Sequence, residues 1–267
     1  MKTYQTRRWM LKSVLFVCLS FLCMPGYGQY AYFVESGKIE YEKRVNMYAK
    51  IKSRIDQNNN NTWLEKIYEE YRRTQPQFAS SKSYLTFNKD RSVYQFLEAA
   101  KTGSSFFSDD PWLMAKNTVE LNFSTDTVRA IKEVYGENYV VTDKKRDILW
   151  KLTNEVREIA GYQCRRANGL ILDSIYVVAF YAEQILPSGG PESFTGLPGM
   201  ILGVALPHEN VTWFATKVET QSIVPPTALP APRRAKEVNF QAYQDWLQGS
   251  VKDWGDWGSD ALKAFLL

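Results

Sequence analysis

Apolar side chains alternate with polar ones over most of this chain, and a period of two is typical of β-strands with one buried face. Between residues 37 and 47, for example, Ile39, Tyr41 and Val45 share one parity. The gaps between such stretches are short, which antiparallel neighbours allow and parallel crossovers do not. We therefore expect a mainly β fold built on a curved, half-barrel-like antiparallel sheet. The predicted strands are 37–47, 83–87, 93–97, 119–123, 128–135, 139–142, 148–152, 162–166, 170–180, 200–206 and 211–218.

The predicted strand 170–180 differs from the others because both of its parities are apolar. Ile175 and Val177 lie on one face, and Tyr176 and Val178 lie on the other. A strand of this kind is covered on both sides. We expect one side of the curved sheet to carry a helix and its concave side to be packed or filled by a ligand.

Helical spacing occurs near both ends of the predicted sheet. Thr62 and Glu65 form a capping-box pattern before a helix that ends ahead of Pro76. Near the other end, prolines make a stiff connector that precedes a second helical pattern. A Trp-rich stretch then ends the chain, and we expect this tail to dock on the body. The residues are Pro225, Pro226, Pro230 and Pro232 in the connector, Phe240, Tyr243, Trp246 and Leu247 in the helical pattern, and Trp254 and Trp257 beyond it.

The first 28 residues resemble a cleavable signal peptide. Basic side chains precede an apolar run, residues 13–24, of roughly 12 residues, whereas a membrane span needs about 20. Gly26 and Gly28 are small residues at the −3 and −1 positions of a cleavage site before Gln29. We expect export to the periplasm or cell surface with no membrane anchor after cleavage. The predicted parts are a leader (1–28), an antiparallel β domain (29–222), and a Pro-rich connector with a Trp-rich tail (223–267).

Charge and cysteine content exclude several classes of protein. The chain has 33 basic and 29 acidic side chains, and the leader holds four basic ones and no acidic one, so the mature chain balances 29 against 29. A near-neutral chain has no overall field that attracts nucleic acid or anionic lipid. The leader also holds two of the three cysteines, which leaves Cys164 alone and excludes an internal disulfide.

One hexapeptide carries a family resemblance. Gly196-Leu197-Pro198-Gly199-Met200-Ile201 resembles the signature of the GLPGLI family of exported bacterial proteins, with Met200 in place of leucine. The resemblance extends upstream through Trp150-Lys151-Leu152-Thr153, Gly161-Tyr162-Gln163-Cys164 and Ala179-Phe180-Tyr181, with Phe180 where the family has tryptophan. It implies export and a β-rich domain. It supplies no catalytic residue, because the family has no established activity.

Physical chemistry offers two interpretations of this hexapeptide. Proline presets its φ angle and glycine accepts a positive one, so Leu197 to Met200 suit a type II turn at a corner between two core strands. The alternative is a binding loop at the rim of the sheet. In that case the candidate binding residues are Gly196, Leu197, Pro198, Gly199 and Met200, with Phe180 and Tyr181.

Catalytic chemistry is hard to assemble from the remaining residues. His208 is the only histidine, so a His-rich metal site is excluded. Cys164 is a candidate reactive thiol, although a buried core thiol suits its place on a predicted strand better. We expect His208 to be a solvated turn residue, the pair Asp109-Asp110 to lie in a loop, and Asp253, Asp256 and Asp260 to form a solvated acidic tail. No cofactor or metal is expected.

Three functional hypotheses remain from the sequence. The first is a non-catalytic envelope binding or carrier protein for an apolar small molecule, by analogy with half-barrel carriers. The second is a structural or interaction protein that serves an outer-membrane assembly and docks on an envelope protein through its Trp-rich tail. The third is a thiol-dependent enzyme centred on Cys164.

Overall fold

The computed structural model describes residues 33–57, 61–98, 106–220 and 230–267. The predicted leader, its cleavage site before Gln29, and Pro225 and Pro226 of the connector lie outside these residues. Among the described residues, no helix is long and apolar enough to cross a membrane.

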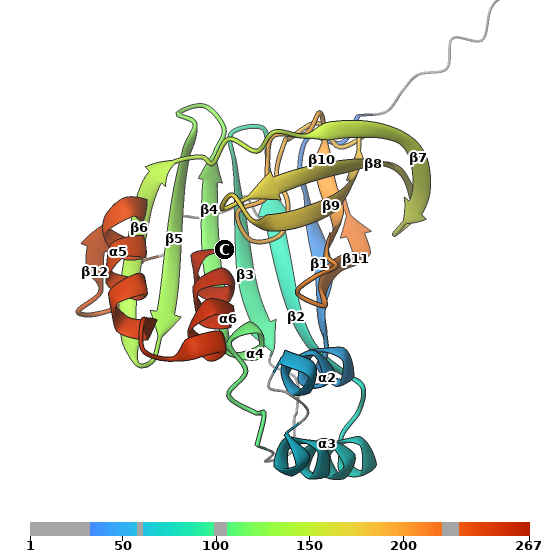
Figure 1. Ribbon diagram of the computed structural model, residues 1–267. Helices are drawn as coiled ribbons and strands as arrows, with labels where there is room; N and C mark the ends of the chain where they lie inside the picture. Colours follow the sequence, from blue (N-terminus) through green and yellow to red (C-terminus); the bar gives the residue numbers. More distant parts are fainter. Residues whose placement is uncertain (1–32, 58–60, 99–105, 221–229) are drawn as a thin grey trace, which may run out of the picture. The chain divides into compact units, whose positions relative to one another are not determined.

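One open sheet of twelve strands organises the described residues (Figure 1). The strands are β1 (Gly37–Asn46), β2 (Phe78–Phe87), β3 (Arg91–Glu98), β4 (Asn117–Asn122), β5 (Thr127–Val134), β6 (Glu137–Lys144), β7 (Lys151–Ile159), β8 (Tyr162–Ile171), β9 (Ile175–Ala182), β10 (Met200–Leu206), β11 (Val211–Glu219) and β12 (Lys236–Val238). Their order is β12-β6-β5-β4-β3-β2-β1-β11-β10-β9-β8-β7. Neighbours are antiparallel except for β12, which pairs with β6 in parallel. The prediction of a mainly β fold on a curved sheet is confirmed.

The sheet curls until the segment between β9 and β10 reaches β3 and β4. Glu192 of that segment accepts hydrogen bonds from Tyr94 on β3 (3.4 Å) and from Asn117 on β4 (2.9 Å). The segment between β9 and β10 therefore packs against this part of the sheet.

Two helices, where the sequence predicted one, follow β1: α2 (Met47–Gln57) and α3 (Thr62–Thr74). Strand β1 ends one residue before Met47, which begins α2 and is buried with Ile51 and Ile55 at four-residue spacing. This short apolar stripe escaped the prediction. The cap of α3 is Asn61, whose side chain accepts the Trp63 N–H, and not the predicted Thr62. The segment around Asp110 also contains a one-turn helix, α4 (Pro111–Met114).

The predicted strand 170–180 is two strands joined by a tight turn. Leu172 and Asp173 both have positive φ angles, 48° and 59°, and reverse the chain between β8 and β9. Apolar residues on both sides of the turn hid it from a periodicity argument. Strand β9 is covered on both faces, as the sequence predicted. Val177 and Tyr181 belong to one buried apolar cluster, and Val178 and Phe180 belong to the other. Strand β7 likewise begins at Lys151 and not at 148.

The tail docks on the body as two helices, α5 (Phe240–Val251) and α6 (Gly255–Leu266), seen in red in Figure 1. The Trp246 ring lies 4.4 Å from that of Tyr139 on β6. The expected solvated acidic tail is wrong at Asp260, whose carboxylate accepts hydrogen bonds from Lys50 (3.1 Å) and Arg54 (2.8 Å) of α2. Arg54 also donates to Asp110 (2.8 Å), which is fully buried as the cap of α4. These ion pairs join the tail to α2 and α4.

Candidate functional site

The signature hexapeptide forms a corner between β9 and β10, but not through the predicted type II turn. The Gly199 N–H donates to the Leu197 carbonyl (2.8 Å), which closes a three-residue γ-turn about Pro198. The Met200 N–H donates instead to the Ile185 carbonyl (2.9 Å). In a type II turn this N–H would donate to the Leu197 carbonyl. The hydrogen bond to Ile185 replaces that bond, so the chain forms a γ-turn at Pro198.

Both glycines of the corner have conformations or neighbours that exclude a side chain. Gly199 has φ of +145°, and a Cβ there would lie 2.3 Å from the Ala182 carbonyl oxygen. Gly196 has φ of +91° and faces the indole of Trp150, whose Nε1 donates to the Thr195 carbonyl (2.9 Å). This geometry is what a corner that redirects the chain requires.

The candidate binding residues of the sequence do not converge on one pocket. Leu197 and Met200 are buried and belong to different apolar clusters. Phe180 and Tyr181 are neighbours on β9, so their side chains lie on opposite faces. The Phe180 ring lies 6.2 Å from that of Phe214, whereas Tyr181 packs in the other cluster.

A buried polar network lies beneath the segment that leads into this corner. Glu192 is only 3 % exposed and has a φ of +52°. It accepts hydrogen bonds from Tyr94 and Asn117, and Asn117 in turn accepts one from the Lys132 ammonium (3.4 Å). Sequence reasoning missed this role, because a glutamate beside Gly190 and Pro191 is typical of a solvated loop.

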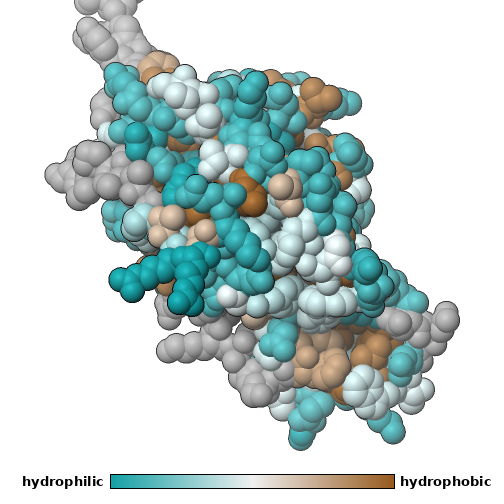
Figure 2. Space-filling view, turned by 90° about the vertical axis from the view of Figure 1, so that its left-hand side faces the viewer, coloured by the Kyte–Doolittle hydropathy of each residue, from teal (hydrophilic) through white to brown (hydrophobic). Residues whose placement is uncertain are grey.

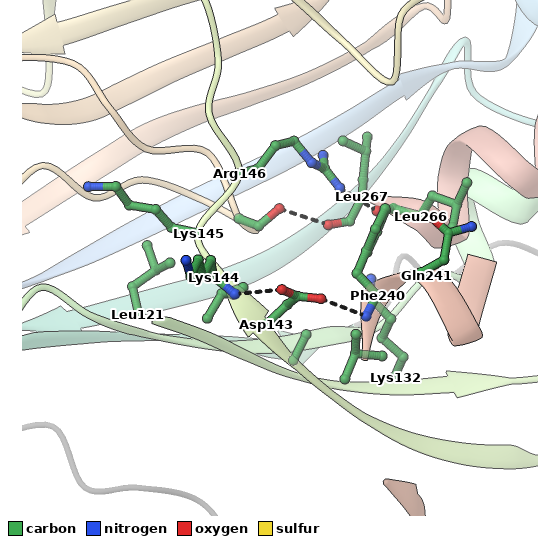
Figure 3. Close-up of a pocket in the computed structure, with 14 residues that line it drawn as sticks. Leu121, Lys132, Asp143, Lys144, Lys145, Arg146, Phe240, Gln241, Leu266 and Leu267 are labelled. Carbon is green, nitrogen blue, oxygen red and sulfur yellow. Dashed lines mark hydrogen bonds between the residues drawn. The ribbon is translucent and has the colours of Figure 1, made fainter. Parts of the chain in front are cut away.

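A cavity of about 340 Å³ lies beside this network, between the sheet and the tail (Figure 3). Its apolar lining comes from β4, β5 and β6, from α5, and from the end of α6 with the residue that follows it. Cationic side chains lie around the same space. The apolar residues are Leu121, Val128, Ala130, Val141, Phe240, Leu266 and Leu267, and the cations are Lys132, Lys144, Lys145 and Arg146. The signature residues 196–201 do not line it.

The cations that line this cavity are unevenly exposed. Lys132 is 3 % exposed, and burial lowers the pKa of its ammonium to about 8, although the nearby Glu192 carboxylate opposes the shift. Burial also lowers the pKa of the Arg146 guanidinium to about 10. Lys144, by contrast, is exposed. Desolvation of the charged form explains both shifts.

An exposed apolar groove runs along α3, the helix at the lower end of the molecule in Figure 1. Trp63 is 56 % exposed and Phe106 is 60 % exposed, and their rings lie 5.3 Å apart. Figure 2 shows hydrophilic residues over most of the same face of the molecule. Such patches often mark contact sites.

Cys164 and His208 lie in separate places. Cys164 is fully buried in β8, and its thiol donates to the Tyr162 carbonyl (3.4 Å). Burial raises the pKa of this thiol to about 12. His208 is exposed in the turn between β10 and β11, near the Tyr176 ring. No hydrogen bond joins the two side chains in the described part of the chain.

The Cys164 thiol is therefore expected to resist alkylation in the folded protein. At pH 7.5 a maleimide should label a chain that begins at Gln29, and so lacks Cys18 and Cys23, at least about 100-fold more slowly than it labels the same chain in urea, because the thiolate is rare and buried. Mass spectrometry of timed samples measures both rates. Equal rates would contradict the burial of Cys164 and revive a reactive thiol.

The region that contains the signature hexapeptide also matches a known protein family. Residues 170–203 match one family model. This model is described as a protein of unknown function (Porph_ging), and the matched stretch includes β9 and the corner at residues 196–201. The chain is thus similar over this stretch to a family without an assigned activity. No curated protein matches the chain.

Solved structures show distant likeness. A structure of PNGF-II in space group P21 has a TM-score of 0.48 and 16% sequence identity, and the alignment covers 79% of this chain and 32% of that chain. An uncharacterized conserved protein from Thermus thermophilus has a TM-score of 0.36 and 8% identity, with 77% and 91% covered. The chain thus spans about a third of the length of PNGF-II. At these scores the likeness carries no argument about function.

Proposed function

We propose that this chain is a non-catalytic binding or carrier protein of the bacterial envelope that holds an apolar small molecule. The observation that carries the proposal is the cavity of about 340 Å³ with apolar walls from β4 to β6 and α5. Ligand sites typically have volumes of about 300–1,000 Å³ and are mostly apolar with a few polar groups. The candidate binding residues predicted from the sequence lie at the signature corner and on β9, whereas this cavity lies between the sheet and the tail.

Export and membership of the GLPGLI family are parts of the same proposal. The leader pattern in residues 1–28 supports export. The hexapeptide at residues 196–201, together with the family-model match over residues 170–203, supports the family. In this proposal the hexapeptide is a structural corner, because Gly199 leaves no room for a side chain and Gly196 has a positive φ angle of +91°.

The alternative hypothesis, an interaction protein that docks through its tail, has weaker support. Trp246 stacks on Tyr139, and Arg54 lies 4.7 Å from the centre of the Trp257 ring. Trp254 is 40 % exposed, yet its ring also contacts that of Tyr135 (5.1 Å). These rings are engaged with the body, so the tail offers a partner little free aromatic surface.

Filling the cavity tests the proposal. The Ala130→Phe variant places a ring among Leu121, Val128 and Val141 and is expected to weaken binding of N-phenyl-1-naphthylamine, an apolar fluorescent probe, by at least about tenfold. Probe titration measures the dissociation constants, and urea unfolding checks the fold, since overpacking costs about 1–3 kcal/mol.

Ala242→Phe is the matched control, because Ala242 is exposed on α5 and does not line the cavity. Its affinity for the probe should equal that of the parent chain. A folded Ala130→Phe variant that binds the probe as tightly as the parent would overturn the carrier proposal.

A further inference from the structure

Two cations, Lys132 and Arg146, belong to the lining of the cavity. Lys132 is on β5, and Arg146 is in the segment that follows β6. Both line the cavity together with Leu121, Val128 and Val141, and Figure 3 shows the two side chains among the residues that surround it.

Neither cation has a carboxylate partner within 4.0 Å in the described part of the chain. The Lys132 ammonium donates to the Asn117 amide oxygen (3.4 Å) and lies 5.8 Å from the centre of the Tyr243 ring. The Arg146 guanidinium donates to the Leu266 carbonyl (3.0 Å) and lies over the Phe240 ring (5.2 Å). The Glu192 carboxylate acts on Lys132 from beyond that distance, and Arg146 is only partly buried. A buried cation without a directly paired carboxylate is costly, so the cavity favours an anion.

The carboxylates that line the cavity have other partners. Asp143 accepts hydrogen bonds from the Phe240 N–H (3.0 Å) and from the N–H of its neighbour Lys144 (2.8 Å), so it satisfies the first N–H of α5, whose N-cap is Asn239. The last residue, Leu267, accepts a hydrogen bond from the Ser193 hydroxyl (3.0 Å). Among the side chains of the described lining, one acid stands against three lysines and one arginine.

We propose that the ligand is an amphiphile with one anionic head group, whose chain packs on the apolar wall and whose head is held by Lys132 and Arg146. This inference rests on the proposed carrier function and names its ligand class. A carboxylate or phosphate head would accept hydrogen bonds from both cations and neutralise them. A neutral ligand of the same length would fill the same space but leave both cations without a directly paired anion.

The affinity for such a head group should depend on pH with a definite sign. Burial lowers the pKa of Lys132 to about 8 in the unliganded protein, and an anionic head would raise it again, since an opposite charge favours the ammonium. Affinity is therefore highest below pH 7 and falls as the pH rises through 8, while Arg146 stays charged. The other charged or titratable groups around Lys132 are Glu192, Lys43, Asp143, Lys144, Lys145, Tyr243 and the carboxyl group of Leu267.

Calorimetric titration of the mature chain with dodecanoate and with dodecanol at pH 6.5 tests the inference. Dodecanoate is expected to bind at least about tenfold more tightly than the alcohol. Lys132→Met keeps the length and apolar stem of the side chain and removes the charge, so it should weaken dodecanoate at least about tenfold and leave dodecanol unchanged. Lys151→Met, at an exposed site on β7, is the matched control and should change neither.

The outcomes separate this inference from the proposed function. Equal affinities for acid and alcohol, with no effect of Lys132→Met, would overturn the anionic head group and leave the carrier function in place. Binding of neither compound would overturn both. Vesicles of phosphatidylglycerol, compared with vesicles of phosphatidylcholine, identify the source of the head group. Uptake of phosphatidylglycerol indicates a lipid, whereas binding of dodecanoate without uptake of lipid indicates a free acid. Either result supports the proposal if it is lost in Lys132→Met.

Discussion

A chain that ends at Val238 is expected to lose its cooperative fold, because α5 and α6 are part of the core. Tyr243, Leu247 and Phe265 are buried, and the Tyr243 hydroxyl donates to the Phe265 carbonyl (3.1 Å). Truncation of one such side chain to alanine costs about 2–5 kcal/mol. A whole domain is stable by only about 5–15 kcal/mol, so the loss of both helices exceeds what the rest can sustain.

Urea unfolding followed by circular dichroism measures this effect. Two leucine variants give reference values for the change in the free energy of unfolding. Leu247→Ala, at a fully buried site on α5, should lower the free energy of unfolding by about 2–5 kcal/mol. Leu149→Ala, at a site that is 90 % exposed, should change it by less than about 0.5 kcal/mol. A truncated chain that still unfolds cooperatively would show that the tail is an accessory and would restore the interaction hypothesis.

The Gly199→Ala variant is expected to be the most damaging single change in the signature. A Cβ at this position would lie 2.3 Å from the Ala182 carbonyl oxygen, which is backbone and cannot rotate away, and the φ of +145° is strained for alanine. We expect a loss of about 3 kcal/mol or more in the free energy of unfolding, at the upper end of point-mutation effects.

Variants at two other glycines separate the steric from the conformational contribution to the lost free energy of unfolding. Gly136 has φ of +84° and nothing within 4 Å of an added Cβ, so Gly136→Ala reports the backbone cost alone, about 1–2 kcal/mol. Gly249 lies in α5 with open space around it, so Gly249→Ala should stabilise the protein by about 0.5–1 kcal/mol. If Gly199→Ala were no worse than Gly136→Ala in urea unfolding, the close packing of the corner would be wrong.

Much of the sheet was predictable because alternation reports directly which side chains are buried. The hairpin of β2 and β3 and the strands β4, β5, β10 and β11 appear close to the predicted positions. The prediction failed where the residue pattern of one structural element continues into that of the next without a break. Leu172 and Asp173 form a turn inside an apolar run, and the buried stripe of α2 directly follows the alternation of β1.

The sequence by itself determined most of the strands, though neither β12 nor the turn between β8 and β9, and it determined that one strand is covered on both faces and where the signature corner lies. Those features depend on local periodicity and on the conformational limits of glycine and proline. Only the tertiary structure decided that Glu192, Asn117 and Lys132 meet in one buried network and that the cavity lies under the tail. Asn117 and Lys132 face each other across the paired strands β4 and β5, whereas Glu192 is far from both in the chain. The curl of the twelve-stranded sheet, which no short window of sequence encodes, brings Glu192 to them.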